Sequence, residues 1–151
     1  MSRKNKLPIE NNEGLLLEYG RAFAWINLIE YVLGELIYFK GNLNLANPKL
    51  AKKLLEKKTF GAKIELSRIF LDVSIVRQLE TLNKKRVTLA HSAVSEKRNS
   101  DNVAKKTGRY IIQYNNKEIS LTKNFLKEIV ELAQNLSLKL HAEFTKKSIN
   151  G

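Results

Sequence analysis

The segment from Leu15 to Phe39 constrains the fold more than any other, because it keeps apolar residues at helical spacing for about seven turns. A helix that is apolar on two sides packs against neighbours on both. We therefore expect a central helix from about Glu13 to Phe39, ended by Gly41-Asn42. The apolar positions form two stripes: Tyr19, Phe23, Ile26, Leu33 and Ile37 in one, and Ala22, Trp25, Ile29, Val32 and Leu36 in the other.

Membrane insertion and export are not expected for this chain. The apolar segment is interrupted by charges, which are costly near the middle of a bilayer, so we interpret it as a buried helix. Residues 1–18 lack the continuous apolar stretch of a secretory signal, and the absence of cysteine suits a reducing compartment, so a cytoplasmic location is expected. The interrupting charges are Glu18, Arg21, Glu30 and Glu35.

Three further helical segments follow from periodicity and from likely end signals. Pro48 opens a short helix from Leu50 to about Lys57, and Thr59-Phe60-Gly61 predicts a bend with Thr59 as a cap. The next helix is expected from about Ser74 to Ala93. The last is expected to begin after Thr122 and to continue to about Phe144, with its apolar residues at helical spacing: Phe125, Ile129, Leu132, Leu136 and Leu140.

The region between the last two helices is expected to hold a mobile loop and a hairpin. Residues 95–108 are polar and basic with no apolar period, which is typical of a loop. Residues 110–114 and 118–121 read as two short strands around Asn115-Asn116, since Asn tolerates the positive φ angles of tight turns.

Together these elements predict an all-α fold: a helical bundle of four to five helices with a small β-hairpin inserted before the last helix. The 151 residues suit one domain, which we place at residues 13–146, with flexible termini at 1–12 and 147–151. The aromatic residues of the first helix are expected in the core: Phe23, Trp25, Tyr31 and Tyr38.

The composition favours a polyanionic partner and excludes cysteine chemistry. The formal charge is +12, from 27 Lys and Arg against 15 Asp and Glu. Such an excess favours phosphate contacts and counterion release, although a merely solvated surface in a Lys-rich and Asn-rich chain would have the same charge. With no cysteine, disulfides, thiolate metal sites and cysteine nucleophiles are impossible.

One position on the apolar stripe of the helix expected at residues 74–93 is occupied by a charged residue. The apolar stripe through Leu79, Leu82 and Leu89 passes through Arg86, and the stripe of the first helix passes through Glu30 in the same way. An unpaired buried guanidinium costs several kcal/mol, so Arg86 must meet an anion, an interface or a wet cleft. One explanation is an internal ion pair between Glu30 and Arg86 that orients the two helices.

The surrounding segment also contains a short motif, because Arg86 is followed by His91 with four residues between them. This resembles the R-x(4-6)-H motif of the HEPN family (higher eukaryotes and prokaryotes nucleotide-binding). An Ile29-Glu30 step in a long first helix, the Thr59-Phe60-Gly61 turn and a hairpin before the last helix agree with the resemblance, which spans about Leu15 to Phe144.

The resemblance implies a metal-independent RNA endonuclease of the toxin–antitoxin or antiviral-defence kind, which needs no cofactor and no metal. His91 would move the proton as general base or acid, and Arg86 would stabilise charge on the phosphorane. On an ideal helix these positions differ by about 140° and about 7.5 Å, so one copy does not align them. The resemblance therefore implies a homodimer that joins two motifs in one cleft. Other implied partners are RNA and a cognate antitoxin or regulatory protein.

Further residues around the motif are candidates for supporting roles. The basic residues nearest the motif are expected to bind the RNA backbone, and Thr88 and Glu30 are expected to support Arg86 and His91. His141 stands alone on the last helix with no second ligand candidate nearby and is interpreted as an ordinary helix residue, not a metal ligand. The basic candidates are Lys84, Lys85, Lys97 and Arg98.

Two alternatives from other functional classes remain open. Active members of the family commonly have a polar residue directly after the Arg, whereas this chain has Val87. Val87 favours a non-catalytic HEPN-like helical module that binds a nucleotide, a nucleic acid or a partner protein. The second alternative is a structural dimer in which the charged residues only set helix register.

Overall fold

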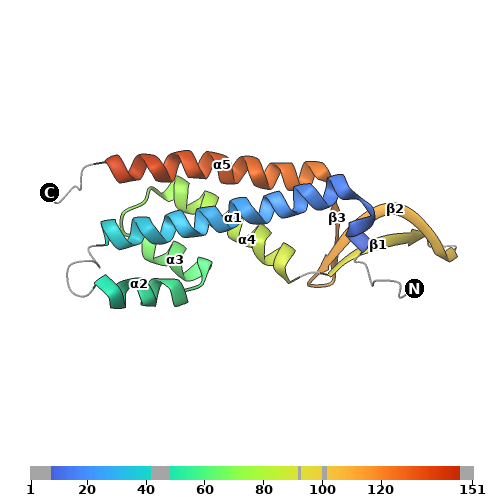
Figure 1. Ribbon diagram of the computed structural model, residues 1–151, viewed down its shortest axis with the longest axis horizontal. Coiled ribbons are helices and arrows are strands. Elements are labelled where there is room, and N and C mark those ends of the chain that lie inside the picture. Colours follow the sequence, from blue (N-terminus) through green and yellow to red (C-terminus); the bar gives the residue numbers. More distant parts are fainter. Residues whose placement is uncertain (1–7, 42–47, 92, 100–101, 147–151) are drawn as a thin grey trace.

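The computed structural model describes residues 8–41, 48–91, 93–99 and 102–146, and it is an α-helical bundle with a small sheet (Figure 1). A 3₁₀ turn, η1 (Pro8–Asn11), leads into the long helix α1 (Glu13–Lys40). Three shorter helices follow: α2 (Pro48–Lys57), α3 (Phe60–Ser67) and α4 (Val73–Ala90). Strands β1 (Ala93–Asn99), β2 (Asn102–Tyr114) and β3 (Lys117–Leu121) precede the last helix, α5 (Lys123–Thr145).

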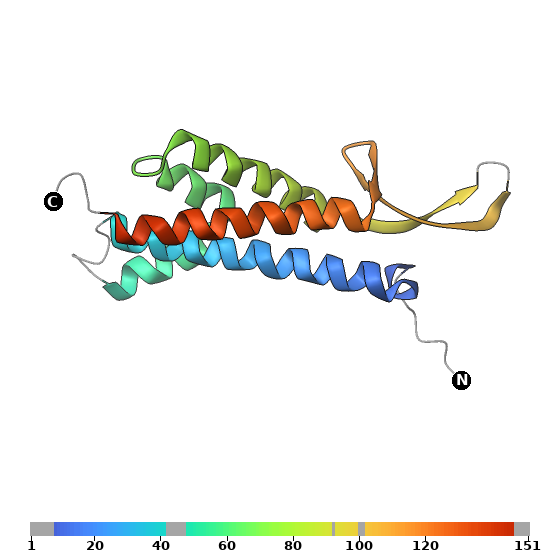
Figure 2. The ribbon, with the colours of Figure 1, turned by 90° about the horizontal axis from the view of Figure 1, so that it is seen from above.

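Helix α1 is the centre of the bundle, as its two apolar stripes predict. α5 lies beside it and runs in the same direction; α3 packs against α1, and α4 packs mainly against α5 (Figures 1 and 2). By length and composition α1 also meets the criteria for a membrane-spanning helix, which the core helices of soluble proteins meet as well. Its buried residues are Leu15, Ala22, Ile26, Ile29, Val32, Leu33, Leu36, Ile37 and Tyr38.

Two helix starts confirm the capping residues expected from the sequence. Thr59 and Thr122 each accept a hydrogen bond through the side-chain oxygen from a backbone N–H three residues later, at 3.2 and 3.1 Å. Asn12, which was not expected as a cap, does the same for α1 at 3.0 Å. At the other end of α1, the N–H of Gly41 donates to the carbonyl of Ile37 at 2.8 Å. The bend expected at residues 59–61 is the short break between α2 and α3.

The sheet corrects the expected loop and enlarges the expected hairpin. Residues 95–108, predicted as a mobile loop, contribute most of β1 and part of β2, so the sheet has three antiparallel strands in the order β1-β2-β3. Val94 of β1 pairs with Ile112 of β2, which is fully buried. This packing against the core, at the end of the β1–β2 pair nearest the helices, compensates for the polar sequence of the two strands. Asn115 and Asn116 form the expected turn with φ of 50° and 60°.

Two further expectations fail near the chain ends and on α1. Residues 8–12, predicted as part of a flexible lead, are ordered because Ile9 is buried in the core and η1 lies against β1. Residues 1–7 and 147–151, the rest of the predicted flexible termini, lie outside the described residues. Tyr31, predicted in the core, is 64% exposed because it borders the open pocket between α1, α2 and α3 instead of a packed interface.

Candidate functional site

Arg86 lies near the end of α4 on the side that faces the core. The neighbouring stripe residues Leu79 and Leu82 are fully buried, whereas the Arg86 side chain is only partly buried. Its Nε donates to Oδ1 of Asn83 at 3.3 Å, and its guanidinium carbon is 6.0 Å from the centre of the Phe60 ring. Because an aromatic face attracts a cation, Phe60 and Asn83 together hold the guanidinium where α3 and α4 meet.

His91 lies one residue beyond α4, so the expected helix to Ala93 is too long. The backbone N–H of His91 closes the helix on the carbonyl of Val87 at 3.0 Å, and the imidazole is exposed. In the part of the chain that the structure describes, no hydrogen bond or ion pair joins His91 to Arg86. One copy therefore presents the two groups separately, as the helical spacing predicts.

Tyr19 contacts the C-terminal end of α4, a role that the sequence did not indicate. Its hydroxyl donates to the carbonyl of Leu89 at 3.5 Å, which satisfies one of the carbonyls left free in the last turn of α4. Burial raises the pKa of the Tyr19 phenol above its ordinary value, which favours the protonated form that donates this hydrogen bond. Tyr19 thus connects α1 to the end of α4.

The ion pair between Glu30 and Arg86, one of the explanations left open by the sequence, does not form. Glu30 Oε1 instead lies 3.5 Å from Nζ of Lys63 on α3, and the two side chains are 27% and 10% exposed. Lys63 lies one turn along α3 from Phe60, so its long side chain reaches α1. No carboxylate of the described residues lies within ion-pair distance of Arg86.

Breaking this pair is expected to destabilise the bundle. Lys63→Met should lower the free energy of unfolding by about 1–3 kcal/mol, because it leaves the partly buried Glu30 carboxylate without its partner. Adding Glu30→Gln should restore part of the loss, and urea denaturation of the four members of this double-mutant cycle measures both effects. Strictly additive effects would contradict a coupled pair.

The remaining sequence candidates lie on α4 and on β1 and have different surroundings. Lys84 is exposed, and Lys85 lies over the Phe125 ring with Nζ 5.3 Å from its centre. Thr88 donates to the carbonyl of Lys84 at 2.9 Å, so its hydroxyl is used within its own helix and does not reach Arg86. Lys97 on β1 pairs with Glu118 on β3 at 3.1 Å, and Arg98 occupies β1 opposite Lys106.

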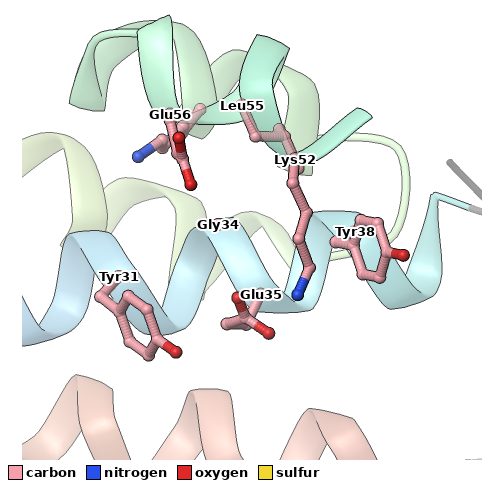
Figure 3. Close-up of a pocket in the computed structure, with 8 residues that line it drawn as sticks. Tyr31, Gly34, Glu35, Tyr38, Lys52, Leu55 and Glu56 are labelled. Carbon is pink, nitrogen blue, oxygen red and sulfur yellow. The ribbon is translucent and has the colours of Figure 1, made fainter. Parts of the chain in front are cut away.

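A pocket lies at the opposite end of α1 (Figure 3). It has a volume of about 290 Å³ between α1, α2 and α3. Tyr31, the pocket residue nearest the start of α1, is about 18 Å along the helix from Tyr19, so the pocket is separate from the end of α4. No cluster of three metal-ligating side chains occurs within the described residues. The pocket is lined by Tyr31, Gly34, Glu35, Tyr38, Lys52, Leu55, Glu56 and Lys63.

Comparison with known proteins found no relative of this chain. No family model matches the chain, and neither the curated proteins nor the solved structures include a significant match.

Proposed function

We propose that the chain is a metal-independent RNA endonuclease of the HEPN kind, acting as a toxin or in antiviral defence. The observation that carries the proposal is the state of Arg86: a partly buried guanidinium on a core-facing position, held over Phe60, while Lys63 neutralises Glu30. A cation kept in such a place without a carboxylate is suited to bind an anion. A phosphodiester is the anion that His91, five residues further along the chain, can help to cleave.

The proposed reaction uses the 2′-hydroxyl of RNA as nucleophile. Its oxygen forms a bond to the adjacent phosphorus, its proton passes to a neutral imidazole, and the bond from phosphorus to O5′ breaks as that oxygen receives a proton. The products are a cyclic phosphate and a 5′-hydroxyl. Arg86 stabilises the negative oxygens of the phosphorane, and His91 transfers protons.

This chemistry favours two copies of the chain. One proton must be removed and another supplied, and two imidazoles can do both in a single step. A homodimer that places two copies of Arg86 and His91 in one cleft supplies them. Lys84 and Lys85 stand within one turn of Arg86 and, with the net charge of +12, are suited to hold the RNA backbone. A cognate antitoxin would cover the same surface.

The test is cleavage without metal. Purified protein is incubated with tRNA or total RNA in excess EDTA, and the fragment ends are identified. We expect fragments with a cyclic phosphate and a 5′-hydroxyl, whereas DNA and RNA whose 2′-hydroxyls are methylated should remain intact. Cleavage that requires a divalent cation, or that leaves a 5′-phosphate, would contradict the proposal, and so would the absence of cleavage.

A non-catalytic binding module is the second candidate. It is favoured by Val87, an apolar residue directly after Arg86, and by the lack of a direct interaction between Arg86 and His91 within the described part of one copy. Such a module would bind RNA with an affinity that falls steeply with salt. Binding by a parent protein that leaves the RNA intact supports this candidate.

A further inference from the structure

The pocket between α1, α2 and α3 has the size of a binding site for a small molecule. Its volume of about 290 Å³ is close to the lower end of the range of roughly 300–1,000 Å³ that ligand pockets have. Gly34 forms part of the α1 wall, and the lack of a side chain there leaves space beside the helix backbone (Figure 3). None of the residues proposed to cleave RNA lines this pocket. The pocket is therefore a candidate for a second site.

Lys63 brings a nearly buried ammonium group to the pocket. Its side chain is only 10% exposed, and its Nζ lies 3.7 Å from the position that a Cβ at Gly34 would take. An ammonium group has three N–H donors. Among the described residues, the single ion-pair partner of Lys63 is Glu30, and the distance of 3.5 Å between Nζ and Oε1 is longer than that of a normal hydrogen bond. Lys63 therefore has donors available to an anionic group in the pocket.

Three more charged side chains border the pocket without a partner of opposite charge. Lys52 and Glu56 extend from α2 toward α1, where Glu35 lies (Figure 3). Lys52 and Glu56 are about one helical turn apart and could pair with each other. Nevertheless, no ion pair or hydrogen bond within the described ranges involves any of these three side chains, and Nζ of Lys52 lies 5.4 Å from the centre of the Tyr38 ring. Charges of both signs thus stay separated around one cavity.

The lining as a whole is neutral and partly apolar. Two lysines and two glutamates line the pocket, so their charges cancel, although the chain carries a net charge of +12. A simple anion would meet the two carboxylates, and a simple cation would meet the two ammonium groups. A ligand with one charge of each sign can pair with both kinds of side chain. The remaining lining offers apolar surface from Tyr31, Tyr38 and Leu55.

We propose that this pocket binds a small zwitterion with an aromatic side chain, which is the chemistry of a free aromatic amino acid. The carboxylate of the ligand accepts hydrogen bonds from the ammonium groups of Lys63 and Lys52. The ammonium group of the ligand lies between the carboxylates of Glu35 and Glu56. Its ring packs against Tyr38 and the neighbouring apolar residues, since aromatic pairs are favourable beyond the area that they bury. This binding does not rest on the proposed RNA cleavage.

Titration with L-phenylalanine tests the class of ligand. NMR chemical-shift titration of the isotope-labelled chain should give a Kd on the order of 10 µM to 1 mM, as expected for a ligand with so few atoms. Hydrocinnamate lacks the ammonium group and phenethylamine lacks the carboxylate, so each should bind at least about 10-fold more weakly. No binding of L-phenylalanine at about 10 mM would overturn the proposal. So would equally tight binding of either analogue.

A matched pair of glycine substitutions tests the place of binding. Gly34→Leu puts a side chain into the pocket and should weaken the binding of L-phenylalanine by at least about 10-fold. Gly20→Leu makes the same change in the same helix, where an added Cβ would meet nothing within 4 Å, and it should bind as the parent does. Helical circular dichroism and the midpoint of thermal unfolding establish that both variants are folded. Parent-like binding by folded Gly34→Leu would overturn the proposal.

Charge substitutions test how the ligand is oriented, and they leave the volume of the pocket nearly unchanged. Lys52→Gln should lower the affinity for L-phenylalanine by about 5- to 10-fold but not that for phenethylamine, because this analogue has no carboxylate. Glu35→Gln should likewise weaken the binding of L-phenylalanine but not that of hydrocinnamate. Lys53→Gln is the control on α2, since Lys53 is exposed and lies outside the lining. Equal losses for all three ligands, or the same loss in the control, would overturn the proposal.

The outcomes for the pocket and for RNA cleavage are separable. Binding of L-phenylalanine by a chain that leaves RNA intact would support the pocket site while contradicting the proposed function. Cleavage of RNA in EDTA by a chain that does not bind L-phenylalanine would overturn the pocket site while supporting the proposed function.

Discussion

Replacing His91 by alanine is expected to lower the rate of RNA cleavage by about 10²- to 10⁴-fold, because the variant loses the group that moves the proton. The imidazole of His91 is exposed beyond α4, so its removal should leave the fold intact. The rate is measured on a defined RNA in EDTA under single-turnover conditions. Helical circular dichroism and the midpoint of thermal unfolding establish that the variant is folded.

The chain offers a matched control for this substitution. His141 is the second histidine of the sequence; it is exposed on α5, where its Nδ1 lies 2.6 Å from the carbonyl oxygen of Ser137. His141→Ala should cleave at the parent rate, and Arg86→Ala should lose about 10²- to 10³-fold, the usual cost of removing a group that stabilises an oxyanion. Parent-like cleavage by both His91→Ala and Arg86→Ala would show that the motif is not the catalytic site.

The largest expected effect on stability comes from Phe60. Phe60→Ala should lower the free energy of unfolding by about 3–5 kcal/mol, because the ring is fully buried at the start of α3 and its removal leaves a cavity. The same ring lies under the guanidinium of Arg86, so the variant also loses the surface that positions this residue. Urea denaturation measures the loss.

Two other variants separate these roles of Phe60. Ile69→Ala should change stability by about 0.5 kcal/mol or less, since Ile69 is 89% exposed in the turn after α3. Phe60→Leu keeps most of the apolar volume but removes the aromatic face. It should recover part of the stability and should not restore RNA cleavage to the parent rate. A stability loss below about 1 kcal/mol for Phe60→Ala would contradict the packing of α3 described above.

The helices could be predicted because their signals are local. The apolar period of α1, the caps at Thr59 and Thr122 and the turn at Asn115-Asn116 each depend on residues within a few positions. Such local signals favour the same structure largely independently of the tertiary fold. The all-α architecture with strands before α5 followed from them.

Strands β1 and the first half of β2 could not be predicted in the same way. Their polar sequence has no period, and their order comes from pairing between distant residues, such as Glu96 with Tyr110. Burial of Tyr110 and Ile112 stabilises the base of the ribbon, and the neighbours that bury them belong to other elements. A sequence pattern does not report such contacts.

The candidate site was likewise predictable only where it depends on residues of a single helix. The conflict between Arg86 and its core-facing position could be predicted, since it depends on spacing within one helix. The partners could not, because Lys63, Phe60 and Tyr19 reach the site from other helices. Glu30 illustrates the difference: its need for a cation was apparent, yet Lys63 and not Arg86 supplies it.

The contact between η1 and β1 has a consequence for an exposed edge of the sheet. β1 is an outer strand of the sheet, and the free backbone groups of an outer strand can pair with a strand of another molecule. η1 lies against this strand and buries Ile9 beside it. Residues 8–11 therefore lie where they hinder pairing of this outer strand with a strand of another molecule.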